Sequence, residues 1–378
     1  MKSTVYFADL RASIKRNVLD KIQALLDRLE LTSRIQKGDA VAIKLHFGEK
    51  GNTAFVRPIY LRPIVEKVKE AGGKPFLTDT NTLYGGSRSE AISHILTAEE
   101  HGFGLNTVGA PIIIADGLWG NAGVQVKIEG RIFKEVSIAH DIYYADMLIG
   151  VAHFKGHELS GFGGAIKNIA MGCSTREGKL KQHSNVSPWV KASKCKGCRR
   201  CVEWCAYGAI DMQGKVAHID EERCVGCGEC IVICPEGAIM IRWDEVSPVF
   251  QRKMVEYAMG ALKGKEGKAL FLNFLTQISP YCDCYGHSDA PIVGDIGILA
   301  STDPVAIDQA SADLVNAQPG SPFSPYTRGL GPGADKFRAV HKEVDWEIQL
   351  NYGEEMGLGR REYELVAVSY THLTLPTN

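Results

Sequence analysis

Eight cysteines lie close together in this chain, and their spacing is that of a cluster-binding motif. The segments that begin at Cys195 and Cys224 each read C-x-x-C-x-x-C-x-x-x-C, and the second repeats the first at an offset of 29 residues. Three thiolates at this spacing can wrap one loop around a cubane cluster, so the fourth ligand must come from elsewhere. The repeat predicts a pseudo-twofold module that holds two [4Fe–4S] clusters.

The fourth cysteine of each repeat starts a helix and is expected to bind the cluster of the other repeat, as in bacterial two-cluster ferredoxins. The expected ligand sets are Cys195, Cys198, Cys201 and Cys234 for cluster 1, and Cys224, Cys227, Cys230 and Cys205 for cluster 2. The alternative is a pair of zinc sites, but zinc ribbons usually separate two C-x-x-C knuckles by a longer spacer. Ala206 stands where a proline is expected after Cys205, which changes local rigidity but removes no ligand.

Composition narrows the class of protein. Clustered thiols without an export signal indicate metal binding in a reducing compartment, not disulfides. The N-terminus lacks the apolar core of a signal peptide, and no uncharged apolar run approaches the roughly 20 residues that span a bilayer. With 43 basic and 44 acidic side chains, the net charge is -1 and offers no strong field toward nucleic acid or anionic lipid. We expect a cytoplasmic protein that binds neither nucleic acid nor a membrane.

A second chemically rich segment spans residues 153–183. Gly161, Gly163 and Gly164 precede a predicted helix, an arrangement that lets backbone N–H groups approach an anionic cofactor. The segment is not a P-loop, because leucine follows Gly178-Lys179 where Ser or Thr would bind magnesium. The same segment contains several potential ligands and bases, which are His153, His157, Lys167, Cys173 and His183.

Three cysteines lie outside the repeat and suggest a further metal site. A candidate ligand set shares soft or nitrogen donors and comprises Cys173, His183, Cys282 and Cys284, with His287 nearby. The alternative is a set of unrelated buried thiols, which are common in protein cores.

The elements that must position these residues alternate between helix and strand. Apolar runs predict strands at 40–45, 75–78, 111–115, 147–152, 269–274 and 296–300. Helical spacing predicts helices over 14–29, from Pro58 to Gly72, and over 305–315 with Asp303 as cap. This alternation is typical of an α/β fold, a mostly parallel sheet with helices on both faces.

Polar residues follow two of the predicted strands. His46 and Glu49 come after one, and Asp79, Asn81 and Tyr84 come after the next. Open α/β sheets bind ligands at the carboxyl ends of their strands, so both groups are candidates for one cleft. Asp79 and Asn81 are equally suited to forming turns.

The cysteine block interrupts the α/β pattern. We expect an α/β domain at 1–192 plus 245–368, an inserted α+β two-cluster ferredoxin-like domain at 193–244, and a non-native tail at 369–378.

Outside the tail, the chain resembles the prokaryotic domain-of-unknown-function 362 family, whose members often contain an inserted two-cluster ferredoxin. The resemblance rests on HFKGHELSGFGGAIKNIAMGC, CDCYGHSDAPIV, DIGILASTDPVAIDQA and the cysteine block. It implies iron–sulfur binding but no settled reaction.

A shorter stretch from His157 to His183 resembles the nickel-pincer lactate racemases. That resemblance implies an acid or base role for His157, covalent attachment of a nucleotide-type cofactor at Lys167, and a metal-ligand role for His183.

Three functions follow from these observations. The first is an iron–sulfur oxidoreductase that passes electrons between its clusters and a site in the α/β domain, with a redox partner protein or a small-molecule substrate. The second is an isomerase or racemase that uses His157 and Lys167 and has structural clusters. The third is an electron carrier or maturation partner without its own catalysis.

Overall fold

The computed structural model describes residues 2–184, 187–243 and 245–368. Its largest element is an eight-stranded sheet with the order β16-β1-β15-β14-β7-β2-β3-β4. The strands are β1 (Ser3–Asp9), β2 (Ala40–Lys44), β3 (Lys74–Asp79), β4 (Ile112–Ile114), β7 (Met147–His153), β14 (Ala269–Leu275), β15 (Gly297–Ser301) and β16 (Tyr363–Ala367). Only β15 is antiparallel to its neighbours, β1 and β14, and the other pairs are parallel. The predicted α/β class with a mostly parallel sheet is therefore confirmed.

All six apolar runs predicted as strands are strands of this sheet, whereas β1 and β16 were not predicted. The predicted helix over 14–29 is shorter in the structure, because Asn17 caps it. The Asn17 side chain accepts hydrogen bonds from the N–H groups of Leu19 and Asp20 at 2.8 and 3.2 Å, so the helix begins at Val18. Ile14, which the helical pattern placed on the apolar face, is fully exposed.

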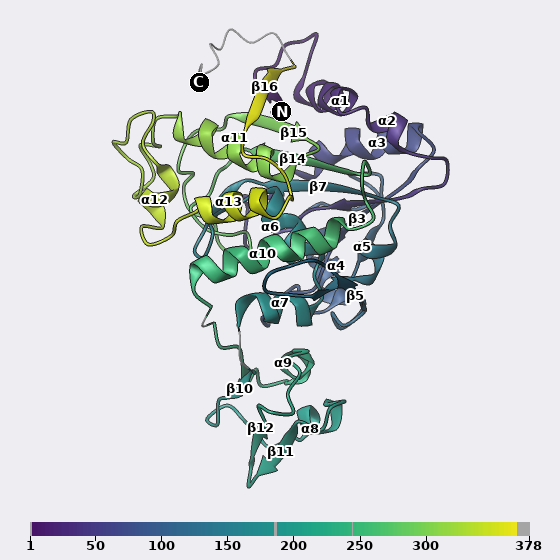
Figure 1. Cartoon of the computed structure of the whole chain (residues 1–378), viewed down its shortest axis with the longest axis vertical. Coiled ribbons are helices and arrows are strands. Elements are labelled where there is room, and N and C mark those ends of the chain that lie inside the picture. Colours follow the sequence, from purple (N-terminus) through teal and green to yellow (C-terminus); the bar gives the residue numbers. More distant parts are fainter. Residues whose placement is uncertain (1, 185–186, 244, 369–378) are drawn as a thin grey trace.

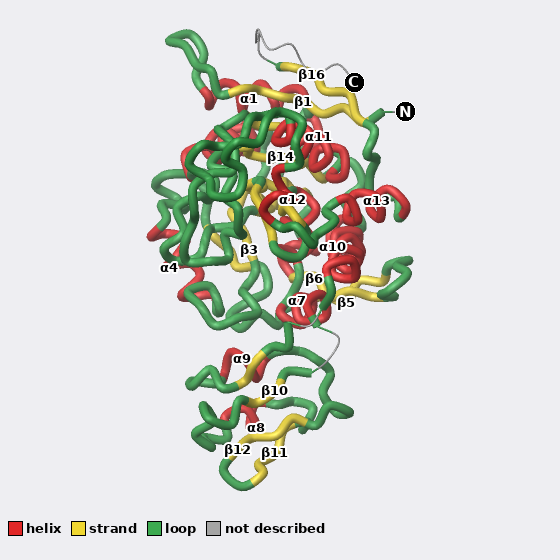
Figure 2. Tube along the Cα trace, turned by 90° about the vertical axis from the view of Figure 1, so that its left-hand side faces the viewer, coloured by secondary structure: helices red, strands yellow, loops and turns green. Residues whose placement is uncertain are grey.

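Helices cover both faces of the sheet (Figures 1 and 2). The α-helices are α1 (Val18–Arg28), α2 (Leu31–Arg34), α3 (Arg62–Glu70), α4 (Ala91–Glu100), α5 (His140–Tyr144), α6 (Ala165–Ala170), α7 (Arg176–His183), α8 (Arg200–Trp204), α9 (Glu229–Ile233), α10 (Ser247–Leu262), α11 (Pro304–Asn316), α12 (Lys336–Val340) and α13 (Glu347–Glu355). Along β2, Val41 and Ile43 pack with α1 and α3, whereas Ala42 faces the core formed with α6, α10 and α11. Such strands are apolar on both faces, which is why they read as continuous apolar runs.

Shorter elements complete the large part of the molecule. They are the hairpin strands β5 (Gly123–Lys127) and β6 (Glu135–Ala139), the hairpin strands β8 (Lys155–His157) and β9 (Gly161–Gly163), and the 3-10 turns η1 (Pro58–Leu61) and η2 (Met171–Cys173). None of the described helices combines the length and the apolar character that crossing a membrane requires.

The cysteine-rich segment forms a small lobe below the sheet (Figure 1). It contains α8, α9 and the short strands β10 (Trp189–Val190), β11 (Ile210–Gln213), β12 (Val216–Ile219) and β13 (Ile239–Met240). The repeat is also visible in the strand pairing, because β10 pairs with β13 in the same way that β12 pairs with β11. Trp189 pairs with Met240, and the residues shifted by the 29-residue offset, His218 and Asp211, pair with each other. β10 precedes the expected boundary at residue 193, while residue 244 and the expected tail at 369–378 lie outside the described residues. The division of the chain into an α/β domain and an inserted ferredoxin-like domain stays a prediction.

Candidate functional site

A cavity of about 530 Å³ lies where four parallel strands end. β14, β7, β2 and β3 are consecutive in the sheet and parallel, so their carboxyl ends meet at one edge. The ionisable side chains that line the cavity are Lys44, His46, Asp79, Tyr84, Arg88, Lys155, His157, Glu158, Lys167, Lys179, His183, Cys282, Cys284 and Tyr285. Residues from both predicted polar groups therefore meet in one cleft.

Glu49 and Asn81 are not part of that lining. The carboxylate of Glu49 accepts hydrogen bonds from the Ser87 N–H at 2.8 Å and from the Tyr84 hydroxyl at 3.2 Å. Asn81 donates from its side-chain amide to Asp116 at 3.0 Å. Both residues support the loops that carry the lining.

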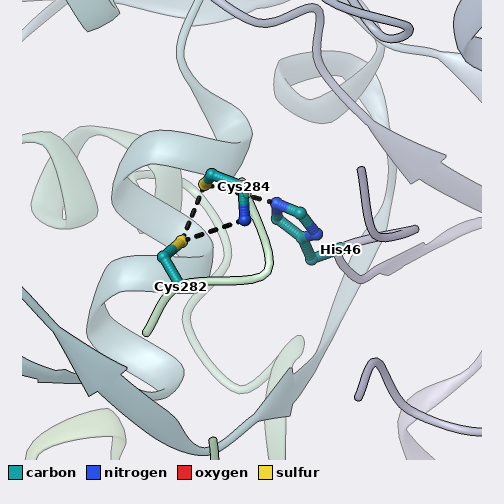
Figure 3. A group of neighbouring side chains, drawn as sticks. All are labelled: His46, Cys282 and Cys284. Carbon is teal, nitrogen blue, oxygen red and sulfur yellow. Dashed lines mark hydrogen bonds between the residues drawn. The ribbon is translucent and has the colours of Figure 1, made fainter. Parts of the chain in front are cut away.

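Two cysteines and a histidine form a close cluster in the cavity (Figure 3). The Sγ atoms of Cys282 and Cys284 lie 2.7 Å apart, and Cys284 Sγ lies 3.6 Å from His46 Nε2. One donor atom from each of the three residues lies within 4.8 Å of the others. The sequence placed Cys282 and Cys284 together and named His46 as a candidate for the cleft, but it did not include His46 in the candidate metal-ligand set.

The expected four-residue metal set is not assembled around this cluster. Cys173 sits in η2, packs in the apolar core and does not line the cavity, and burial raises the pKa of its thiol to about 12. His183 lines the cavity but is not part of the close group. His287 does not line the cavity, and its backbone carbonyl accepts a hydrogen bond from Asn52 at 3.2 Å.

The loop that carries the cysteine pair is held by a buried carboxylate. Asp283 faces away from the cavity lining, and its side chain lies 2.9 and 3.0 Å from Nδ1 of His153 and 3.5 Å from Nζ of Lys155. His153 Nε2 lies 2.9 Å from the carbonyl oxygen of Thr276. Burial opposes ionisation of Asp283, but His153 and Lys155 lower its pKa below the usual range. This contact fixes the two cysteine side chains on either side of Asp283.

The two thiols of the pair differ in acidity. The hydrogen bond from Cys282 lowers the pKa of Cys284 to about 6, and the positive charges of Lys167 and Arg88 act in the same direction against the effect of burial. The same hydrogen bond, together with burial, raises the pKa of Cys282. Lys167 Nζ lies 3.3 Å from Cys282 Sγ. Burial alone would lower the pKa of Lys167, but the charges of Cys282 and Cys284 raise it.

The predicted site histidines His157 and His183 line the cavity in opposite tautomers. His157 Nδ1 accepts the backbone N–H groups of Leu159 and Ser160 at 3.2 Å, so the ring proton is on Nε2. His183 Nδ1 lies 2.9 Å from the Lys179 carbonyl oxygen and donates to it, which leaves Nε2 as an acceptor. Burial lowers the pKa of both rings, that of His183 to about 4. One neutral imidazole therefore presents a donor and the other an acceptor.

The three glycines predicted to approach an anionic cofactor pack against other parts of the protein, and the N–H groups that follow them are already hydrogen-bonded. The N-terminal N–H groups of α6, from Ala165 and Ile166, donate to the Asp308 carboxylate at 2.7 and 2.9 Å. A Cβ at Gly164 would lie 2.2 Å from Asp308 Oδ1, and one at Gly161 would lie 2.5 Å from Trp346 Cβ. Gly163 leaves room for the Lys167 side chain, whose Cδ would be 2.9 Å from an added Cβ. None of the three glycines lines the cavity.

The eight cysteines of the repeat surround two small cavities in the lobe. One cavity is lined by Cys195, Cys198, Cys201 and Cys234, and the other by Cys205, Cys224, Cys227 and Cys230. All eight thiols are free. The fourth cysteines have equivalent surroundings, because Cys205 Sγ accepts the Ala209 N–H at 3.3 Å and Cys234 Sγ accepts the Ala238 N–H at 3.2 Å. Four thiol donors converging on one space, with backbone N–H groups directed at sulfur, suit an iron–sulfur cluster.

The second of these cysteine sets lies against the large part of the molecule. A Cβ at Gly228, between Cys227 and Cys230, would lie 3.5 Å from Cδ1 of Leu83, a residue that lines the 530 Å³ cavity. Asn121 donates to Glu229 at 2.9 Å across the same contact, and α9 is the lobe helix nearest the sheet (Figure 1). Leu83 thus lies between this cysteine set and the cavity.

Fold and site define an α/β protein with a cavity at the carboxyl edge of a parallel sheet and a cysteine-rich lobe beside it. The chain belongs to the DUF362 family, a domain of unknown function that matches residues 41–313. No curated protein matches it.

Two solved structures are similar to part of this chain. The lactate racemase apoprotein from Thermoanaerobacterium thermosaccharolyticum has a TM-score of 0.39 and 14% identity, covering 73% of this chain and 51% of that one. A protein from Thermotoga maritima has a TM-score of 0.38 and 10% identity, covering 70% of this chain and 52% of that one. The chain spans about half the length of these structures.

Proposed function

We propose that this protein is a cytoplasmic iron–sulfur redox protein that moves electrons between two [4Fe–4S] clusters and the cavity of its α/β part. The observation that carries the proposal is the grouping of the eight cysteines into two sets of four, each drawn from both repeats. This grouping agrees with the crossed ligand sets expected from sequence, and one set lies directly behind the cavity wall at Leu83.

The two cysteine sets differ in what they contact: one is accessible to a partner protein, and the other lies next to the cavity. Cys198, in the set that does not contain Cys227, is exposed, so a redox partner protein can approach it. The set containing Cys227 contacts the large part of the molecule through Leu83 and Arg176. When bound, such clusters carry one electron each. We call the set that contains Cys227 the inner set. The chain's own residues place it beside the cavity in which a substrate would bind.

The cavity lining favours a small anionic substrate. Lys179 is buried, and among the described residues no carboxylate oxygen lies within 4.0 Å of its Nζ. Burial lowers the pKa of Lys179 to about 8, so it is mostly protonated at neutral pH. A bound anion would neutralise this ammonium group.

The test is anaerobic reconstitution of the full chain, followed by assays of iron and acid-labile sulfide. We expect eight of each per chain, with about half of each in Cys227→Ser. Cys173→Ser is the matched control, because Cys173 is a buried thiol outside both cysteine sets, and it should retain the full content. A wild-type content far below eight irons would refute the proposal.

One observation favours a second candidate, an isomerase or racemase. A donor imidazole on His157 and an acceptor imidazole on His183 share the cavity with Lys167, as a proton-transfer reaction between two faces of a substrate requires. If this candidate is right, intact mass spectrometry should show a covalent adduct at Lys167 and metal analysis should find nickel. An unmodified Lys167 in nickel-free protein would count against it.

A further inference from the structure

His46 is in the wrong tautomer to bind a metal together with the cysteine pair. Its Nδ1 accepts the Gly48 backbone N–H at 3.0 Å and so carries no proton. Burial and the nearby cations, Arg88 first among them, lower the pKa of the ring well below its usual value, so the ring is neutral. The remaining proton is therefore on Nε2, the atom that faces Cys284 Sγ at 3.6 Å. A metal-binding histidine instead donates its far N–H to an acceptor and keeps the near nitrogen free.

The hydrogen-bond donors and the positive charge around the cysteine pair would stabilise one cysteine as a thiolate beside the other as a thiol. His46 Nε2–H points toward Cys284, and Cys282 lies within hydrogen-bonding distance of the same sulfur at 2.7 Å. The Lys167 ammonium supplies a positive charge at 3.3 Å from Cys282. Cys284 is partly exposed, and Cys282 is buried at 2% exposure. A reachable thiolate backed by a buried thiol is the arrangement of a dithiol that attacks and then closes on itself.

Little movement is needed to close the pair. A disulfide bond is about 2.05 Å long, so the two Sγ atoms must approach each other by about 0.7 Å. Asp283, which separates the two cysteines, is anchored by His153 and Lys155 and keeps both side chains at the cavity floor. The two sulfur atoms are therefore already close to bonding distance.

We propose that Cys282 and Cys284 form a redox-active dithiol/disulfide pair that exchanges electrons with the substrate at the cavity floor. Reduction of the disulfide takes two electrons and one proton, breaks the S–S bond, and yields the Cys282 thiol and the Cys284 thiolate beside Lys167. Oxidation by the substrate, which must accept two electrons, reverses this balance and releases the proton to solvent. The inference rests on the proposed function in one respect: the electrons come one at a time from the reduced iron–sulfur module.

The test is differential alkylation of the full chain, with and without reconstituted clusters. Samples equilibrated anaerobically in dithiothreitol buffers of graded redox poise are quenched, alkylated and digested. Peptide mass spectrometry then reads the segment that contains both cysteines. We expect it to be doubly alkylated at reducing poise and to be two hydrogens lighter and unalkylated at oxidising poise, with a single two-electron transition.

Variants give the matched controls. Cys282→Ser and Cys284→Ser should each abolish the transition, whereas Cys173→Ser should leave it unchanged. Both thiols remaining alkylatable at every poise would overturn the proposal. So would one equivalent of zinc, nickel or extra iron that is present in the wild type and lost in Cys284→Ser.

The outcomes separate the two proposals. A disulfide that forms in a chain unable to hold eight irons would leave the dithiol standing and remove the proposed function. Full iron content without a disulfide would do the reverse. As a second readout, pre-oxidised holoprotein should consume two more reducing equivalents from dithionite than the Cys282→Ser, Cys284→Ser double variant.

Discussion

Arg176 packs against Gly228: a Cβ at Gly228 would lie 3.2 Å from Cγ of Arg176. Arg176 begins α7 in the large part of the molecule, and Gly228 lies between two cysteines of the lobe. The guanidinium donates from Nη2 to the Ser89 carbonyl at 2.6 Å, while Nε and Nη1 have no hydrogen-bond partner among the described residues. Burial lowers the pKa of Arg176 to about 10, so it is positive at neutral pH. A buried positive charge thus lies beside the inner cysteine set.

Replacing this charge should make the inner cluster harder to reduce. In Arg176→Gln, the added electron loses a nearby cation, and we expect the reduction potential of one cluster to fall by an amount on the order of 1 kcal/mol, about 40 mV for a one-electron couple. EPR-monitored redox titration measures both clusters in one sample. Arg131→Gln, at an exposed arginine paired with Glu355, is the control and should move neither potential. Equal shifts of both clusters in Arg176→Gln would contradict the assignment of one inner set.

The crossed cysteine sets predict how paired substitutions combine. Cys205→Ser and Cys227→Ser affect the same set, so the double variant should lose about as much iron as either single variant. Cys205→Ser with Cys198→Ser affects both sets and should lose nearly all iron. Iron and sulfide assays after identical reconstitution give the comparison. If each fourth cysteine instead served its own repeat, the two double variants would exchange behaviour.

The Asp308 carboxylate should contribute strongly to the free energy of unfolding, because it holds the start of α6, the helix that carries Lys167. Its carboxylate accepts the first N–H groups of α6 and the Asn273 side-chain amide at 2.7 Å. Asp308→Ala would leave these buried donors unpaired, and we expect the free energy of unfolding to fall by about 3 kcal/mol or more in urea denaturation. Asp313→Ala, on the same helix α11 but at an exposed position, should cost about 1 kcal/mol or less.

The same carboxylate predicts a pH dependence of stability. Burial raises the pKa of Asp308 to about 6, above its model-compound value of 3.8. The folded state then holds the proton to higher pH than the unfolded chain does. The contribution of this group to the free energy of unfolding should therefore decrease as the pH rises from about 4 to 6 and stay constant above that range. Comparison of urea midpoints across this range in the wild type and Asp308→Ala isolates the effect, which the variant should lack.

The acidity of Cys284 can be measured directly. Its pKa of about 6 means that the thiolate, and with it the alkylation rate by iodoacetamide, should rise to half of its maximum near pH 6. Lys167→Met removes a stabilising positive charge, so the midpoint should move to higher pH and the rate at pH 6 should fall several-fold. Lys37→Met, at an exposed lysine outside the cavity, should have no effect. An unchanged midpoint in Lys167→Met would show that Lys167 does not act on the pair.

Local sequence pattern predicted most strands of the sheet and the grouping of the eight cysteines. The apolar runs predicted six strands; five of them are buried on both faces of the sheet, and the edge strand β4 exposes Ile113. The cysteine repeat predicted two crossed sets, and the lobe groups the cysteines in the same way. The first helix is shorter than predicted because the Asn17 side chain caps it, although the apolar spacing extends back to Ile14. The meeting of the loops after β2 and β3 followed from the rule that parallel strands share their carboxyl edge.

The contents of the site depended on tertiary structure. His46 and Cys284 are 238 residues apart and meet only because the strands before them, β2 and β14, flank β7 in the sheet. Asp308 caps α6, although it lies more than 140 residues further along the chain. Its carboxylate accepts the N–H groups that the glycine pattern predicted to be available for a cofactor. Residue types and local spacing determine elements and clusters of nearby ligands. Strand order and helix packing determine which distant side chains touch, and no local pattern encodes those contacts.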